Sequence, residues 1–184
     1  MQLGVRRALE VETIRYKKTY GILLIYAAAL LLLGLLSGDI RELLPGLWTI
    51  IINEDTLITD YIQLAGLGPA FVNAAIVTYI SIAILYFAKD PPNGYTIVDI
   101  GLMSGFALFG KNFVNIWPII LGTWLYARLK REPFSKYAGV ALLSTALAPV
   151  VSFVGLGGHW ASLPAAVLVG VSIGFILPPL SGYT

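Results

Sequence analysis

The stretch Gly105-Phe-Ala-Leu-Phe-Gly-Lys-Asn-Phe-Val-Asn-Ile-Trp-Pro118 places a lysine, Lys111, and two asparagines in the middle of an otherwise apolar segment, residues 95–127. A cation inside hydrocarbon costs about 2.5–3.5 kcal/mol on insertion scales, so an intramembrane lysine usually faces protein or water. Glycine and proline bracket this lysine, and these are the residues at which helices break. The stretch therefore predicts two half-helices that meet at a break, and Lys111 is the first candidate for a solute site.

The composition is that of a membrane protein with several spans. Hydrophobic residues make up 58% of the 184 residues and charged residues 12%, and the mean hydropathy is +0.82. A soluble domain carries about 25% charged residues, and one soluble core of this size could not bury so much apolar surface. We therefore expect an all-α polytopic membrane protein whose surroundings are the lipid bilayer of the inner or plasma membrane.

The residue types present exclude several kinds of site. The chain has no cysteine and a single histidine, His159. Disulfides, thiolate metal sites and a cysteine nucleophile are thereby excluded, and one histidine is too few for a histidine-built metal site. A pH-sensing role for His159 is a minor alternative to an interfacial position. We expect no metal and no cofactor, and no nucleic-acid motif is present.

About six hydrophobic segments follow one another along the chain. The predicted membrane helices are residues 20–37, 62–88, 137–156 and 161–177. Pro149 predicts a kink in the third of these, and Pro178-Pro179 is expected to end the fourth. Residues 39–61 contain only a short apolar run, interrupted by Pro45, and are predicted to be interfacial or re-entrant.

The segment 95–127 is expected to be a broken or re-entrant helix pair. Each half has about 15 residues and a length of roughly 22 Å, whereas the hydrocarbon core is about 30 Å thick. One re-entrant hairpin and two short spans are both compatible with these lengths, with the split at Gly110-Lys111-Asn112 and the second half beginning at Phe113.

The basic residues predict the orientation and the domain limits. Ten of the twelve lysine and arginine residues share one side in this scheme, and Arg41 and Lys111 are the exceptions. Acidic residues fall on the other side: Asp39, Glu42, Glu54, Asp55 and Asp60. Basic residues flank cytoplasmic loops, so both chain ends are expected in the cytoplasm. Residues 1–19 form a basic cytoplasmic segment, compatible with an interfacial helix, and residues 20–180 form a single transmembrane domain.

The candidate substrate-binding residues are Lys111, Asn112, Asn115, Asn73 and Asp99. At a buried break, Lys111 and the positive end of the second half-helix would attract an anion or a substrate carboxylate. Lys111 could instead pair with Asp99 as a gate. The competing interpretation places Lys111 in water at a hairpin tip, or has its side chain reach the interface. Asp99 is most simply explained as a charge at a helix N-terminus.

Two asparagines lie in a short repeat. Residues 68–73 and 110–115 share the pattern G-x-x-F-V-N, which arises either by chance or from the paired broken helices found in transporters. A buried asparagine amide in lipid must bond to protein, trapped water or solute. Asn73 and Asn115 therefore line a pathway or bond between helices. Asp60 is expected to cap the helix that follows it.

Other features favour packing over chemistry. Gly170-Val-Ser-Ile-Gly174 fits the G-x-x-x-G pattern of close helix contacts. Ser144 and Thr145 have no general base nearby in the sequence, and no histidine–carboxylate pair is evident. We do not expect an enzyme.

Several runs resemble a bacterial family of uncharacterised multi-pass membrane proteins whose members often carry the domain twice in tandem. The runs are residues 57–61, 71–75, 105–112, 115–119 and 134–137. The resemblance covers roughly residues 45–180 and implies no catalytic or binding residue. This chain resembles one copy, which implies self-association into a homodimer or higher oligomer, or a partial chain. Residues 66–77 and 105–124 are more weakly similar to urea-transporter repeats.

These observations lead to two functional expectations. The first is a membrane transporter or channel subunit for a small solute or ion, with its site around Gly110-Lys111-Asn112. The alternative is a non-transporting integral-membrane scaffold or interaction protein, in which the helices pack closely and Lys111 faces water. An intramembrane enzyme is the least supported possibility.

Overall fold

The computed structural model describes residues 2–56, 58–158 and 161–182, with side chains from Thr13 onward. Over these residues the structure is helical, and its only extended pairing is an isolated bridge between Asp60 and Phe109. Four helical stretches are long and apolar enough to cross a membrane: Thr13–Leu36, Leu67–Ala88, Phe134–Leu156 and Leu163–Leu180. The prediction of an all-α polytopic membrane protein is thus confirmed, and His159 lies outside the described residues.

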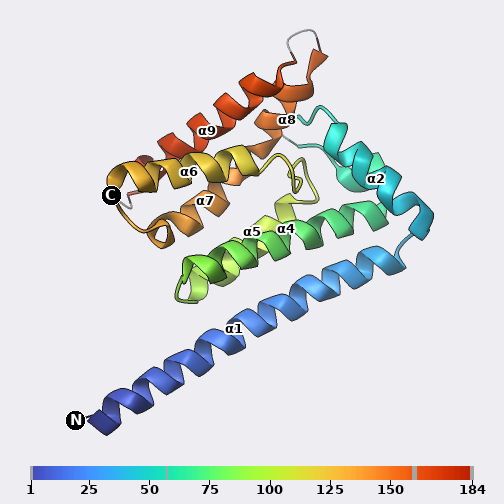
Figure 1. Ribbon diagram of the computed structural model, residues 1–184. Coiled ribbons are helices and arrows are strands. Elements are labelled where there is room, and N and C mark those ends of the chain that lie inside the picture. Colours follow the sequence, from blue (N-terminus) through green and yellow to red (C-terminus); the bar gives the residue numbers. More distant parts are fainter. Residues whose placement is uncertain (1, 57, 159–160, 183–184) are drawn as a thin grey trace.

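The first two long helices pack antiparallel. The hydroxyl of Tyr20 on α1 (Gln2–Leu36) donates to the backbone oxygen of Asp90, just beyond the end of α4 (Leu67–Ala88), at 3.1 Å. At the other end of the pair, Gly34 packs against Val72. α1 runs without a break through residues 19 and 20 (Figure 1), so a separate interfacial helix over residues 1–19 is not formed.

In the sequence, two short helices connect α1 to α4, and they lie at the end of the bundle far from the N-terminus (Figure 1). These are α2 (Ile40–Ile52) and α3 (Tyr61–Ala65). Asp60 accepts hydrogen bonds from the amides of Ile62 and Gln63, at 2.9 and 3.1 Å, so its predicted role as a helix cap is confirmed. The predicted helix 62–88 is divided at Gly66, whose φ of 89° is readily adopted only by glycine.

The segment 95–127 forms a hairpin of two half-helices, α5 (Gly94–Phe106) and α6 (Trp117–Lys130). Its open ends lie at the same end of the bundle, and its tip points back into the bundle (Figure 1). The predicted break is present, but it extends over residues 107–116 and the second half-helix begins at Trp117, not at Phe113. The hairpin geometry favours the re-entrant interpretation over two short spans.

A second break lies opposite the hairpin tip. The stretch from Phe134 to Leu156 consists of η1 (Phe134–Tyr137), α7 (Ala138–Ser144), η2 (Thr145–Leu147) and α8 (Ala148–Leu156). Pro149 has no N–H to donate to the carbonyl of Thr145, so the predicted irregularity occurs there. A Cβ added to Gly110 would lie 2.9 Å from Cγ of Pro149, so the two breaks are in direct contact.

The last helix, α9 (Leu163–Leu180), packs tightly on α6 through glycines. A Cβ on Gly174 would overlap the carbonyl oxygen of Ile119, as expected of the G-x-x-x-G pattern. α9 continues through Pro178 and Pro179, which were predicted to end it. Pro178 cannot donate to the carbonyl of Gly174, and the hydroxyl of Thr123 donates to that oxygen instead, at 2.8 Å.

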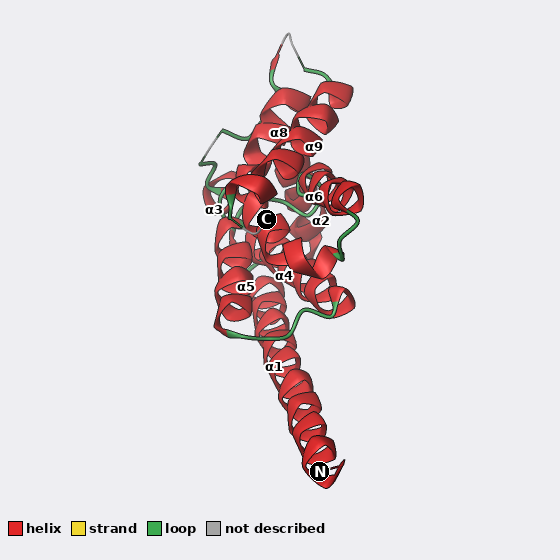
Figure 2. Cartoon of the chain, turned by 90° about the vertical axis from the view of Figure 1, so that its left-hand side faces the viewer, coloured by secondary structure: helices red, strands yellow, loops and turns green. Residues whose placement is uncertain are grey.

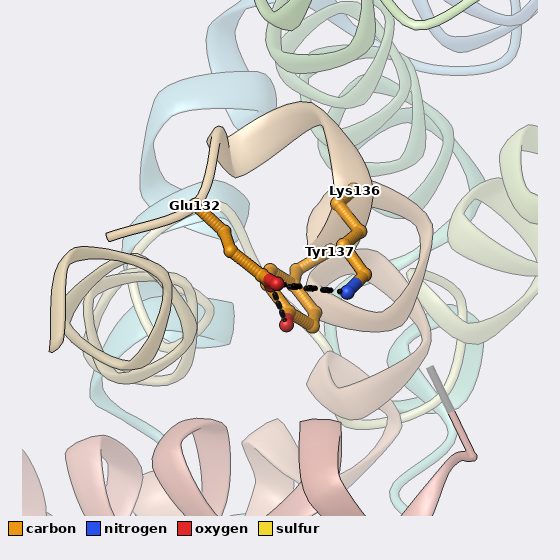
Figure 3. Close-up of polar contacts among 3 residues, drawn as sticks. All are labelled: Glu132, Lys136 and Tyr137. Carbon is orange, nitrogen blue, oxygen red and sulfur yellow. Dashed lines mark hydrogen bonds and ion pairs between the residues drawn. The ribbon is translucent and has the colours of Figure 1, made fainter. Parts of the chain in front are cut away.

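One end of the bundle carries most of the basic residues, and we call it the basic end. Lys89 ends α4, Lys130 and Arg131 end α6, and Lys136 lies in η1. α1 extends beyond the bundle on this side, away from the other helices (Figure 2). Hydrogen bonds from Tyr137 and Lys136 hold the pKa of Glu132 below its usual range (Figure 3).

Candidate functional site

The hairpin tip is fixed in place by the segment that leads into α4. The amide of Tyr61 donates to the carbonyl of Leu108 at 3.1 Å, next to the bridge between Asp60 and Phe109. α5 has 13 residues and therefore a length of about 20 Å, against a hydrocarbon thickness of about 30 Å. A helix of this length is too short to cross a membrane.

Lys111 is buried at this tip, with 1% of its surface exposed. Its ammonium lies 3.1 Å from the sulfur of Met103 and 5.3 Å from the ring centre of Phe106. Across the described residues, Lys136 and Glu132 form the single ion pair, so Lys111 has no carboxylate within 4.0 Å. The predicted pair with Asp99 is not formed, and the interpretation that placed Lys111 in water is wrong.

The surroundings of the Lys111 ammonium are soft and uncharged. A thioether sulfur is a weak hydrogen-bond acceptor, and a cation above an aromatic ring gains about 0.5–2 kcal/mol. Neither contact replaces the hydration that a buried ammonium loses. Among the described residues Lys111 therefore has no counter-ion, and an anion is the ligand that would compensate a charge there.

Asn73 holds the backbone of the hairpin tip. Its amide nitrogen on α4 donates to the carbonyls of Ala107 and Lys111, at 2.7 and 2.9 Å. Its side-chain oxygen accepts from the amide of Phe113 at 3.3 Å. The side chain is fully buried, so these backbone groups have no access to bulk water. Asn73 thus supplies partners that an intact helix would have supplied.

Asn112 and Asn115 cap each other inside the tip. The side-chain oxygen of Asn112 accepts from the amides of Val114 and Asn115, both at 2.9 Å, and that of Asn115 accepts from the amide of Asn112 at 2.9 Å. The amide nitrogen of Asn115 donates to Gly110 and Ser152, each at 2.9 Å. The backbone amides of residues 112–115 are thus occupied, and the ammonium of Lys111 is the charged group of the tip that could bind an anion.

We predict that Asn73→Ala destabilises the protein by about 3–5 kcal/mol, because each buried polar group left without a partner costs about 1–3 kcal/mol. Thermal unfolding of the detergent-solubilised protein measures the change. Gln63→Ala is the control, because Gln63 is exposed on α3, and we expect a change of about 0.5 kcal/mol or less. Equal stability of the two variants would contradict the assigned role of Asn73.

Asp55, one of the acidic residues expected on the side opposite the basic residues, is buried. Its exposed fraction is 0%, and it accepts from the hydroxyl of Tyr61 at 2.9 Å and from Asn53 at 3.1 Å. The amide nitrogen of Asn115 lies 3.5 Å away. Burial raises the pKa of Asp55 and outweighs the lowering by the hydrogen bonds from Asn53 and Tyr61. A buried carboxyl group thus lies beside Asn115 of the tip.

Asp99 lies in the sixth position of α5 and does not act at its N-terminus. Asn93 caps this helix, accepting from the amides of Tyr95 and Thr96. The interpretation of Asp99 as a helix-terminal charge is therefore wrong. Asp99 is 7% exposed and lies one helical turn before Met103, whose sulfur contacts Lys111. The hairpin places Asp99 between Lys111 and the basic end.

Two hollows lie beside the hairpin, and Lys111 lines neither of them. A cavity of about 160 Å³ at the basic end is lined by residues that include Asp99. A wider hollow of about 540 Å³ is lined by Phe106, Phe109 and Leu147, together with Ile58 of the loop before α3. Met103, one helical turn after Asp99 of the first cavity, contacts Lys111, and Phe106 both contacts Lys111 and lines the second hollow.

The two G-x-x-F-V-N segments do not share a local structure. Residues 68–73 lie within α4, whereas residues 110–115 form the irregular tip. Their asparagines nevertheless both bond to the backbone of the tip, Asn73 at Lys111 and Asn115 at Gly110. The repeat thus marks two sides of one break and not a pair of equivalent broken helices.

These features define a helical membrane protein in which a hairpin of half-helices enters the bundle and ends at a buried lysine. Residues 40–184 match the family DUF1576, described as a protein of unknown function, and the chain belongs to that family. The expected resemblance to an uncharacterised family is confirmed. The matched region begins at α2 and includes the hairpin, Asp55 and both hollows.

Neither the curated proteins nor the solved structures yield a match to this chain. The tandem arrangement and the similarity to urea-transporter repeats therefore stay predictions. The family description names no substrate and no functional residue, so a function has to be argued from the site.

Proposed function

We propose that this protein is a membrane transporter, or a channel subunit, for a small anionic solute that binds at Lys111. The observation that carries the proposal is the buried ammonium, which is 1% exposed and has a sulfur and an aromatic ring as its neighbours. Polar groups inside a membrane are costly and commonly mark solute pathways. A bound anion would supply the missing charge.

The arrangement of the tip supports a binding site at this depth. Irregular backbone within a membrane is tolerated where it is surrounded by protein or lines a cavity, and transporter sites commonly lie at such discontinuities. In this proposal Asn73, Asn112 and Asn115 hold the tip in shape through the hydrogen bonds described above. They position Lys111 and are not themselves the main ligands of the solute.

The two hollows support access from either side in turn. Lys111 contacts Met103, one turn from the Asp99 that lines the basic-end cavity, and Phe106, which lines the wider hollow. Phe106 is 41% exposed, so its ring has room to move. In the proposed cycle, displacement of the Phe106 ring opens the site to the far side, and displacement of Met103 opens it to the basic end.

The orientation and the assembly state are also part of the proposal. Lysine and arginine concentrate on the cytoplasmic side of plasma-membrane proteins, so the basic end is assigned to the cytoplasm, together with both chain ends. The substrate then leaves or enters the cytoplasm past Asp99. Self-association into a homodimer or higher oligomer is also proposed, because two tandem copies of the domain are predicted for members of the similar family.

Flux into proteoliposomes tests the function. Vesicles containing the purified protein would be loaded with candidate anions, both inorganic ions and small carboxylates, and uptake or current compared with protein-free vesicles. The proposal expects saturable movement of at least one anion. A packed protein without movement of any anion, cation or neutral solute would favour the scaffold alternative, which the close α6–α9 contact at Gly174 makes the second candidate.

A further inference from the structure

A cavity at the basic end has the composition of a cation site and is distinct from the tip. Its volume is about 160 Å³. The polar residues that line it come from the turn before α5, from α5 itself and from η1: Asp90, Asn93, Thr96, Asp99, Ser135 and Lys136. A water molecule occupies about 30 Å³ in the liquid, so the cavity has room for an ion with several waters.

The carboxylate of Asp99 is buried against this cavity without a partner. Asp99 is 7% exposed. Among the described residues no hydrogen bond or ion pair to its side chain is formed. Gly139 provides the space beside it, since a Cβ there would lie 2.8 Å from Oδ2 of Asp99. An unpartnered buried carboxylate is costly unless a cation or ordered water compensates it.

The lysine beside the cavity does not provide that compensation. The ammonium of Lys136 lies 3.0 and 3.1 Å from the two carboxylate oxygens of Glu132, and Figure 3 shows it directed at that residue. Lys136 keeps its charge but is paired with Glu132. Asp90 and Asp99 line the same cavity, and among the described residues neither carboxylate has a basic group within 4.0 Å.

The nature of these groups selects the class of cation. Carboxylate and hydroxyl oxygens are hard ligands that favour Mg²⁺ and Ca²⁺. Mg²⁺ usually keeps several waters and binds through one or two carboxylates, whereas Ca²⁺ takes about 6–8 oxygen ligands. Two carboxylates, the free hydroxyl of Ser135 and space for water match the Mg²⁺ pattern.

We propose that the cavity between α5 and η1 binds a partly hydrated Mg²⁺ ion through Asp99 and Asp90, with Ser135 as a third oxygen ligand. The ion neutralises both carboxylates and joins α5 to the segment that begins the next span. This site is separate from Lys111, and the proposal does not depend on whether the protein transports a solute.

Thermal unfolding of the purified full-length protein in detergent tests this proposal. A ligand that binds only the folded state raises the melting temperature in a saturable manner. We expect MgCl₂ to produce such a rise at millimolar concentrations, beyond that given by NaCl at equal ionic strength. We expect Asp99→Asn to weaken the apparent Mg²⁺ affinity on the order of tenfold or more, because the ligand charge is reduced.

Asp39→Asn is the matched control. Asp39 caps α2 through a hydrogen bond from the amide of Arg41, and asparagine caps helices equally well, so the Mg²⁺ response should be retained. If Asp99→Asn does not fold, Asp90→Asn and the binding of Mn²⁺ to the unmodified protein, followed by its paramagnetic signal and displaced by Mg²⁺, make the same test.

Three results would overturn the proposal. The first is a melting temperature that does not respond to Mg²⁺. The second is a response to Mg²⁺ in the Asp99→Asn and Asp90→Asn variants that equals the response of the unmodified protein. The third is a full response to NaCl that Mg²⁺ does not increase. The last would indicate a monovalent ion. None of these results depends on flux, so failure of this proposal is distinguishable from failure of the transport proposal.

Discussion

Replacing Lys111 by methionine is expected to reduce solute flux strongly while making the protein more stable. Removing one partner of a buried charge contact costs about 2–5 kcal/mol of binding, and about 1.4 kcal/mol corresponds to a factor of ten. We therefore expect flux to fall on the order of 100-fold. Proteoliposome uptake of the anion identified for the unmodified protein measures the fall.

The gain in stability has a separate physical cause. The ammonium of Lys111 is 1% exposed and has no carboxylate partner, and a cation in such surroundings costs about 2.5–3.5 kcal/mol. Methionine has a similar length and packs well beside the sulfur of Met103 and the ring of Phe106. Lys111→Met should therefore raise the unfolding free energy by about 2 kcal/mol.

Lys18→Met is the control for both measurements. Lys18 is an exposed lysine on α1, and its replacement should change flux little and stability by about 0.5 kcal/mol or less. Unchanged flux in Lys111→Met would remove Lys111 from the site. Lost flux accompanied by a large loss of stability would mean that Lys111 supports the fold, contrary to the expected separation of the two effects.

The second large effect is expected at the contact between α6 and α9. A Cβ on Gly174 would overlap the carbonyl oxygen of Ile119 and approach the amide nitrogen of Thr123 to 2.9 Å. Both are backbone atoms of α6, which cannot move without separating the helices. Gly174→Ala should therefore destabilise the protein by about 4 kcal/mol or more, and thermal unfolding in detergent measures it.

A second contribution comes from Thr123. Its hydroxyl donates to the carbonyl of Gly174, the group that Pro178 leaves without a helical partner. Separating α6 from α9 breaks this bond and exposes that carbonyl. Gly101→Ala is the control, because a Cβ at Gly101 would have no atom within 4 Å; there we expect a gain of up to about 1 kcal/mol, from helix propensity. A mild effect at Gly174 would mean that the two helices are not in contact as described.

The fold class and the position of the break could be predicted because each depends on local sequence. A cation flanked by glycine and proline in an apolar segment predicts a helix break at Lys111 whatever surrounds it. The kink near Pro149 and the cap at Asp60 are equally local. The family itself was recognisable from short runs, and residues 40–184 confirm it.

The features that were missed depend on partners far away in the sequence. Asp55 and Glu54 are adjacent acidic residues, and only the fold reveals that Asp55 is buried against Tyr61. Pro178 was expected to end a helix because the hydroxyl of Thr123, which bonds to the carbonyl of Gly174 that Pro178 leaves free, comes from a distant part of the sequence. The residue that lies beside Asp99 is Gly139, 40 positions later, so its cavity was not predictable from the sequence around it.

Chemical labelling of a cysteine at position 111 tests the central claim most directly, namely that the tip of the hairpin holds this side chain away from bulk water. The chain has no other cysteine, so Lys111→Cys provides a unique thiol. A membrane-impermeant thiol reagent added to either side of sealed vesicles should react slowly, because the side chain at this position is buried. Rapid labelling from either side would contradict a buried transport site at Lys111.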